Sequence, residues 1–136
     1  MQPQISEHSE IIDIFAIVSQ IAAEVPYNTH HLDHIFRVFK ISQDILKHEP
    51  ADKMIVEAAA CLHDLGRFFD DDQDMHEVIS SAKAMEILSG RRWEKNVIEK
   101  VCYAIEMHRF SKTHVPETIE ARILQDSDKL DALGAI

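Results

Sequence analysis

The hydrophobic positions of this chain recur at steps of three and four residues, which is the period of an α-helix. In the first such segment, which begins near Ser6, apolar residues fall at Ile11, Phe15, Val18, Ala22 and Val25. Pro26 follows and is expected to end this segment. The pattern therefore predicts an amphipathic helix that buries one face.

A second helix is predicted from Thr29, which can cap it, to Leu46. One stripe along it consists of Ile35, Phe39, Ser42 and Leu46, and the neighbouring stripe consists of His34, Val38, Ile41 and Ile45. His34 is therefore expected to point inward.

Two further helices are predicted on either side of a loop. The third runs from Ala51 to Leu65, and Gly66 is expected to end it in the left-handed conformation, so that His63 and Asp64 occupy its last turn. The fourth opens at His76 and closes at Gly90, with an apolar stripe of Val78, Ala82, Met85 and Leu88.

The last two predicted helices also carry polar residues on apolar stripes. The fifth has Val97, Val101, Ala104 and then His108, which is therefore expected to face the core. Pro116 is expected at the first position of the sixth helix, whose stripe is Ile119, Ile123, Asp126, Leu130 and Leu133. With only three glycines and four prolines, the chain is predicted to be all-α, a bundle of about six helices.

Length and composition indicate one globular domain over residues 1–136, with 46% hydrophobic and 28% charged residues. The formal net charge of -10 argues against stable binding to nucleic acid or to anionic membranes. The sequence has no secretory signal and no apolar run that could span a bilayer, so a cytoplasmic location is expected. Cys61 and Cys102 stand alone in apolar segments and are interpreted as reduced core residues.

The segment "FFDDDQDM" carries alternating aspartates at Asp70, Asp72 and Asp74. A calcium-binding loop does not fit, because its sixth position is Met75 where glycine is needed and its twelfth is Ser81 where glutamate is needed. We expect a solvated acidic loop.

Histidines and aspartates that point inward on separate helices must satisfy one another, because an unpartnered buried charge costs several kcal/mol. A divalent cation would satisfy them together, with His34, His63, Asp64 and one aspartate of "QDSDKLDALG" as ligands. Taken singly, each histidine could instead be a hydrogen-bonded core residue, and the His-Asp pair could be a helix-end feature. The spacing alone leaves the coordination geometry open.

The ordered motifs of this chain resemble those of the HD-domain metal-dependent phosphohydrolase superfamily, and most closely its small stand-alone bacterial branch. The motifs are His34 with the "RV" at 37 and 38, the "HD" at 63 and 64, His76, His108 and "DSDKLDALG". They cover the chain from about Thr29 to its C-terminus. The resemblance implies an all-α bundle that holds a divalent ion.

Carried over by position, the resemblance implies metal ligands at His34, His63, Asp64 and Asp128. Asp128 is preferred to Asp126 because it begins the D-x-x-D-A-L arrangement of "DKLDAL", whereas helical periodicity favours Asp126. The resemblance further implies His76 and His108 as ligands of a second ion, with Asp64 bridging. Supporting roles are expected for Asp126, Asp131, His30 and Asp33, whereas a surface position is the plain alternative for His31. The metal could be manganese, iron, cobalt, magnesium or zinc, with one or two ions per chain.

Two departures from the family pattern affect the substrate pocket. Arg67 follows the HD segment where many relatives have lysine, which keeps the charge but gives a planar phosphate-binding fork. The sequence stops at "LDALGAI", whereas relatives usually continue through further helices that wall the pocket.

The leading hypothesis is hydrolysis of a phosphate ester or anhydride of a nucleotide-like substrate by metal-activated water. Asp64, Asp128 and Arg67 are the candidate catalytic residues. Candidate contacts to phosphate are Arg67, Arg109, Lys112 and Lys129. The expected partner is a small phosphorylated compound, with a homodimer as one option for the assembly. The alternatives are a degenerate HD domain that binds a nucleotide without turnover, a di-iron oxygenase of the same fold, and a helical protein with incidental histidines.

Overall fold

The structure, a computed structural model, describes residues 7–25, 29–69, 75–109 and 115–134. In these ranges helices are the only regular secondary structure, which confirms the predicted all-α class. The elements are α1 (Glu7–Ala23), α2 (Thr29–Leu46), α3 (Lys53–Leu62), the 3₁₀ helix η2 (Leu65–Phe68), α4 (His76–Gly90), α5 (Lys95–Glu106) and α6 (Ile119–Ala132).

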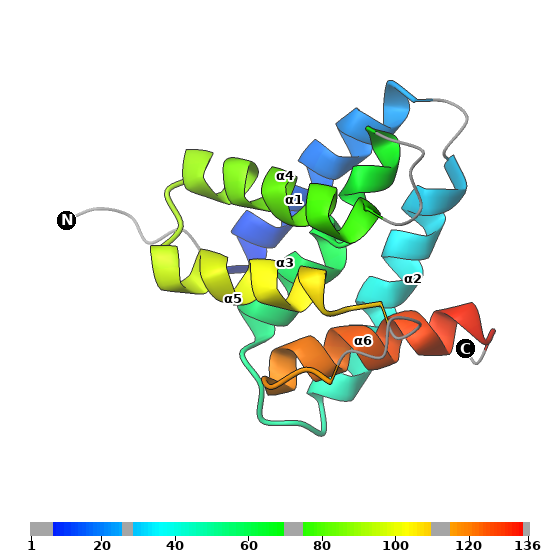
Figure 1. The fold of residues 1–136 in the computed structure, drawn as a ribbon, viewed down its shortest axis with the longest axis vertical. Coiled ribbons are helices and arrows are strands. Elements are labelled where there is room, and N and C mark those ends of the chain that lie inside the picture. The colour runs from blue at the N-terminus through cyan, green and yellow to red at the C-terminus, as the bar shows by residue number, and fades with distance from the viewer. Residues whose placement is uncertain (1–6, 26–28, 70–74, 110–114, 135–136) are drawn as a thin grey trace.

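Helix α3 lies at the centre of the bundle and packs against α1, α2, α5 and α6 (Figure 1). Asp52 starts it, because the Asp52 carboxylate accepts hydrogen bonds from the backbone N–H groups of Met54 and Ile55. From Ile55 to Leu62 every residue is buried, so α3 has no solvent-facing stripe. A helix that is buried on all sides belongs in the core.

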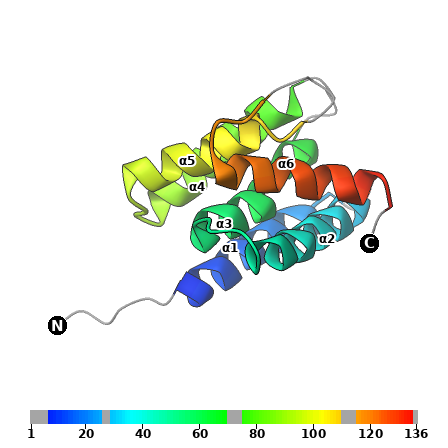
Figure 2. The same ribbon diagram turned by 90° about the horizontal axis from the view of Figure 1, so that it is seen from below.

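Two helix pairs flank α3 (Figure 2). Helices α4 and α5 pack together on one side, and α2 and α6 pack on the other. The buried hydroxyl of Ser42 on α2 donates to the hydroxyl of Ser127 on α6 at 3.0 Å, and Ser127 in turn donates to the Ile123 carbonyl. This pairing brings His34 of α2 level with the C-terminal half of α6.

An ion pair ties α1 to the turn after α4. The Arg91 guanidinium donates to both Glu10 carboxylate oxygens at 3.1 and 2.8 Å and also to Asp13, and the Trp93 indole donates to Glu10 at 2.9 Å. A buried carboxylate with this many donors is well compensated.

The third helix ends earlier than predicted. Helix α3 stops at Leu62, and His63 and Asp64 form the turn between it and η2. Gly66 lies within η2 and not in the left-handed region, so its predicted capping role is wrong. Hydrophobic pattern could not locate this end, because residues 55–66 are buried without interruption.

Gly66 is needed for close approach and not for a positive φ. A Cβ atom there would lie 2.5 Å from the His76 carbonyl oxygen and 2.9 Å from the Ser80 hydroxyl. The Gly66 N–H donates to that same hydroxyl at 2.7 Å. The contact holds η2 directly against the first turns of α4.

The predicted bounds of the fourth helix agree with α4, but of its predicted apolar stripe only Leu88 is buried. Val78 and Met85 are each 49% exposed, whereas the polar residues Glu77, Ser80 and Ser81 are buried. The buried polar groups have partners: Ser80 accepts from Gly66, and Ser81 donates to Glu106 at 2.6 Å. The hydrogen bonds of these polar residues, and not the spacing of apolar residues, therefore determine which face of α4 is buried.

Three smaller predictions also differ from the structure. Helix α1 ends at Ala23, before Val25. Helix α6 begins at Ile119 and is capped by Thr118, which accepts a hydrogen bond from Ala121, so Pro116 is not its first residue. His108 lies beyond the last residue of α5 instead of within it. The acidic loop predicted around residues 70–74 lies outside the described residues.

Candidate metal centre

His34 joins α2 to α6 through two aspartates. Its Nε2 atom lies 2.9 Å from an oxygen of Asp128, and its Nδ1 atom lies 2.6 Å from an oxygen of Asp131. Arg37, one turn further along α2, donates to the other Asp131 oxygen at 2.7 Å. Asp128 and Asp131 are three residues apart and so share one face of α6.

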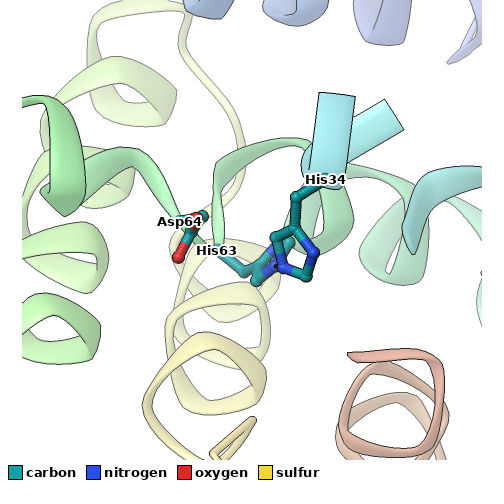
Figure 3. A group of neighbouring side chains, drawn as sticks. All are labelled: His34, His63 and Asp64. Carbon is teal, nitrogen blue, oxygen red and sulfur yellow. Dashed lines mark hydrogen bonds between the residues drawn. The ribbon is translucent and has the colours of Figure 1, made fainter. Parts of the chain in front are cut away.

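His63 is positioned by the turn that follows α3. Its Nδ1 lies 2.7 Å from the backbone carbonyl of Ala60, which is an acceptor, so Nδ1 donates and carries the ring proton of a neutral His63. The free Nε2 atom then lies 3.3 Å from His34 Nε2 and 3.5 Å from an Asp128 oxygen. Figure 3 shows His34 reaching from α2 toward the His63 ring, with Asp64 beside it.

Asp64 is buried between cationic and imidazole groups. One of its oxygens accepts from Arg67 at 2.8 Å and lies 3.6 Å from His76 Nε2. The other oxygen is inaccessible to solvent and accepts no hydrogen bond in the described part of the chain, although His31 Nδ1 lies 3.2 Å away. An unsatisfied buried carboxylate oxygen costs free energy unless a ligand or ion occupies its open side.

His76 and His108 extend the cluster on the α4 and α5 side. The centroid of the His108 ring lies 5.0 Å from that of His63 and 5.5 Å from that of His76. His108 Nδ1 donates to the Ile105 carbonyl, just as His63 Nδ1 donates to that of Ala60. Both rings thereby leave Nε2 for another partner.

The charges of the cluster balance one another. Burial lowers the pKa of His34, but its hydrogen bonds to Asp128 and Asp131 outweigh burial and raise the pKa to about 9. Burial raises the pKa of Asp128, yet the hydrogen bond from His34 and the nearby His63 imidazole hold that pKa below its usual range. The cluster therefore favours ionised carboxylates together with a nearby positive charge.

Two other groups follow the same logic. Burial raises the pKa of Asp64, but the His31 contact and the charges of His63 and Arg67 outweigh it and lower the pKa. Burial and the neighbouring His63 lower the pKa of His108 to about 4, so His108 is a neutral imidazole near pH 7. Ionised carboxylates and a neutral His108 are in the protonation states that bind metal ions, whereas His34 would have to release its Nε2 proton to become a ligand.

The donor set fits a divalent cation. Three groups each place their ligand atoms within 4.8 Å of one another: His34 with His63 and Asp64, His63 with His108 and Asp128, and Asp64 with His76 and His108. Nitrogen and carboxylate oxygen in this mixture suit manganese, iron, cobalt or zinc. The open side of Asp64 adds an acceptor that no donor in the described parts of the chain uses. Because the three groups share members, the cluster has room for one ion or for two close ions.

A cavity of about 380 Å³ opens onto the cluster. Its walls carry three positively charged or protonatable groups besides the cluster itself, namely His31, Arg67 and Arg109. Arg109 also donates to buried Glu77 at 3.2 Å, and Glu77 lies 3.6 Å from His76 Nδ1. The cavity thus combines candidate metal ligands with cations that suit an anionic substrate.

The structure distributes the residues predicted for the site as follows. His34, His63, Asp64, Asp128, His76 and His108 converge, and Arg67 and Arg109 line the cavity. Lys129 is exposed and does not line it, and Lys112 lies outside the described residues. Asp33 is exposed, and the His30 side chain is not among those described.

Three residues have positions that sequence reasoning missed or misjudged. Asp126 is exposed and borders a separate cavity, so its proposed supporting role at the cluster is wrong, whereas Asp131 does hold His34. A surface position was the plain alternative for His31, but His31 lies in the cavity wall beside Asp64. Glu77 was not considered at all. The one available signal was its position next to His76, because a carboxylate near a ligand histidine commonly orients it.

Comparison with known proteins agrees with the geometry. Residues 32–133 match the family model described as HD domain. The chain belongs to the HD-domain superfamily. A structurally similar protein is the predicted HD superfamily hydrolase from an uncultured Thermotogales bacterium, solved as a crystal structure at 1.45 Å resolution. Similarity to it has a TM-score of 0.75 with 28% sequence identity, over 88% of this chain and 67% of that one.

A curated relative carries a different name. The tRNA (cytidine(56)-2'-O)-methyltransferase of Picrophilus torridus is 28% identical over 117 residues. That stretch is 76% of this chain but 32% of the relative, so this HD domain spans about a third of that protein.

HD domains bind divalent metals, and the histidine and aspartate groups of this chain could hold one. A search of the described helices finds none with the length and apolar character needed to cross a membrane.

Proposed function

We propose that this HD domain is a metal-dependent phosphohydrolase that cleaves a phosphate ester or anhydride of a nucleotide-like substrate. The observation that carries the proposal is the buried Asp64 carboxylate. It lies among candidate ligand imidazoles, one of its oxygens accepts no hydrogen bond from the described residues, and it faces a cavity lined by Arg67 and Arg109. Similarity to a protein described as an HD superfamily hydrolase supports hydrolysis.

His34, His63, Asp64 and Asp128 would hold the first ion, and His76 and His108 would join Asp64 in holding a second. A divalent ion supplies, when bound, the Lewis acidity that activates water and neutralises charge on a phosphoryl oxygen. The chain keeps the ligands in place: Ala60 and Ile105 carbonyls fix the His63 and His108 rings, and Asp131 fixes His34. Rings fixed in this way need little reorganisation on binding.

Arg67 and Arg109 would bind the phosphate oxygens that face away from the ligands. Both are partly exposed in the cavity wall and both are anchored by a buried carboxylate, Arg67 by Asp64 and Arg109 by Glu77. A guanidinium carries five N–H donors in a planar fork that matches the oxygens of a phosphate group. In a protein with a net charge of -10, these two local cations would receive the substrate.

The proposal is tested with two aspartates of the same helix. Asp128→Asn removes a proposed ligand, and Asp126→Asn makes the same chemical change at an exposed position nearby. Phosphate release is measured over nucleoside mono-, di- and triphosphates and cyclic nucleotides with added manganese, and metal content is measured by elemental analysis.

We expect Asp128→Asn to release phosphate more slowly than the wild type by more than the roughly 10–100-fold effect of removing a residue that only orients a ligand. The variant should also retain less metal. Asp126→Asn should resemble the wild type in both measurements. Equal activity and metal content in the two variants would refute the assignment. Tight nucleotide binding without turnover across the metal panel would favour a binding module instead.

One observation also favours a second candidate. The Asp64, His76 and His108 group gives room for a second ion, and a paired-iron site of histidines and carboxylates can activate oxygen. Protein prepared with iron would then show visible absorption and consume oxygen with a substrate, and would release no phosphate.

A further inference from the structure

A second cavity, of about 230 Å³, lies between α1 and α2 and shares no lining residue with the metal centre. Its walls include Ile12 and Phe15 from α1 and Phe36 and Phe39 from α2. Ile12 is 54% exposed and Phe36 is 49% exposed. Large apolar side chains are thus left in contact with water around a hollow that no described segment of the chain fills.

The lining of this α1–α2 cavity also includes polar groups, among them Glu57 of α3 and Gln43 of α2. Glu57 is only 5% exposed. Its carboxylate accepts a hydrogen bond from the Gln43 amide at 3.0 Å and forms no ion pair with any described residue. A buried carboxylate with a neutral amide as its partner lacks the cation that normally offsets its desolvation.

The aromatic walls suit a cation as well as an apolar group. The Phe15 ring makes edge-to-face contacts with Phe36 and Phe39, at centroid distances of 5.9 and 5.7 Å. The faces of such rings attract cations, and the ammonium of Lys40 already lies 5.4 Å from the Phe36 centroid. Lys40 lines the cavity but does not pair with Glu57.

We propose that the α1–α2 cavity binds a small organic cation, a protonated amine or guanidine on an apolar body. The charged head would form an ion pair with Glu57, next to the Gln43 amide that already donates to that carboxylate. The apolar body would contact Phe15, Phe36 and Phe39. The cavity is smaller than the roughly 300–1,000 Å³ of sites for drug-sized ligands, so the ligand is a small one. A charged head against a buried carboxylate gives selectivity for amines over neutral molecules of the same shape.

The site lies away from the proposed metal centre but on the same helices. Helix α2 carries both His34 and Phe36, which are about 200° apart around its axis at 100° per residue. Helix α3 carries Glu57, and the turn after it carries His63 and Asp64. The two sites can therefore be tested separately, since the variants below leave the proposed metal ligands untouched.

The experiment compares phenethylamine and phenethylguanidine with phenethyl alcohol, a neutral molecule of similar shape. Binding to the full chain is measured by isothermal titration calorimetry and by amide chemical shifts. The variants are Glu57→Gln, which keeps an acceptor for Gln43, and Phe36→Ala at the rim. Val78→Ala is the matched control, because Val78 is also a 49% exposed apolar residue but on α4.

We expect the amine and the guanidine to bind the wild type at least about 10-fold more tightly than the alcohol, with shifts around Phe36, Phe39 and Gln43. Glu57→Gln should abolish this preference without lowering the melting temperature, because it keeps an acceptor for Gln43 and removes a buried carboxylate that has no cationic partner among the described residues. Phe36→Ala should weaken binding of all three compounds, and Val78→Ala should not. Metal content should be the same in every variant.

Equal affinity of the wild type for amine and alcohol, or no binding of the amine at millimolar concentration, would overturn the proposal. A lower melting temperature of Glu57→Gln with unchanged amine binding would likewise assign Glu57 a purely structural role. An N-acetyl-lysine methylamide probe separates the two sources of such a head group. If this probe binds more tightly than phenethylamine and phenethylguanidine, the ligand is a polypeptide side chain and not a small molecule.

Discussion

Replacing Gly66 by alanine tests how the turn after α3 is held against α4. The added Cβ atom would lie 2.5 Å from the His76 carbonyl oxygen, which is 0.5 Å inside the 3.0 Å limit that real Cβ contacts respect. The obstacle is backbone and cannot rotate away. Segment η2 and helix α4 must therefore move apart by at least roughly half an ångström, which also weakens the Gly66 to Ser80 hydrogen bond.

The expected loss of stability combines two effects. Overpacking of this size typically costs about 1–3 kcal/mol, and loss of a buried hydrogen bond adds about 1 kcal/mol. For a domain of this length the sum corresponds to a decrease of roughly 7–14 °C in melting temperature. The same displacement separates His76 from Asp64, whose facing atoms lie 3.6 Å apart, so metal affinity should fall as well.

Gly90→Ala is the matched control. It makes the same substitution at the last residue of α4, where an added Cβ meets nothing within 4 Å. Alanine there should be neutral or slightly stabilising, because glycine loses more conformational freedom on folding. Thermal unfolding followed by circular dichroism, with metal titration of both variants, measures the difference. A Gly66→Ala protein as stable and as tightly metal-binding as Gly90→Ala would show that η2 and α4 do not touch as described.

Three further outcomes are expected. Asp131→Asn should lower metal affinity about 10–100-fold while the protein stays folded, because Asp131 orients His34 through Nδ1. An unchanged affinity in a metal titration would show that Asp131 does not orient His34. Chelation of the metal should lower the melting temperature, and added manganese should restore it. At a free metal concentration of 100 times the dissociation constant, binding should add about 2.7 kcal/mol to the free energy of unfolding. A melting temperature that does not respond to the chelator would contradict a bound ion. Arg91→Met should cost about 1 kcal/mol or less at neutral pH, since this pair is partly exposed. Hydrogen bonding to Arg91 outweighs burial and lowers the pKa of Glu10 below its ordinary 4.5, so the contribution is present above pH 4.5 and lost as the pH falls through the lower value. Denaturant titrations from pH 3 to 7 should therefore show the two proteins converge in acid, and a constant difference would refute this assignment.

The periodicity of the sequence was sufficient to predict the existence and the order of the helices. The bounds of the predicted fourth helix match α4, from His76 to Gly90, and the second helix matches α2. The reason is that a helix on the surface of a bundle needs an apolar stripe, and such a stripe repeats at three and four residues. The same reasoning failed for the end of α3, because that helix is buried on all sides and carries no stripe to read.

The resemblance of the motifs, and not periodicity, pointed to the aspartate of α6 that contacts His34. The hydrophobic stripe favours Asp126, which the structure leaves exposed, whereas Asp128 lies 2.9 Å from His34. Periodicity ranks positions by the apolar character of their neighbours, and a site built of charges does not follow that ranking.

The sequence by itself determined an all-α chain and the residue types of the candidate metal centre, because helix period and motif order are local properties. Only the tertiary structure decided which atoms meet. His31, Glu77 and Asp131 acquired their roles from contacts between residues far apart in the chain or from burial. The unpaired carboxylate of Glu57 beneath the phenylalanines of α1 and α2 is likewise invisible in the sequence, since burial and the absence of a counter-charge among the described neighbours arise only when helices pack.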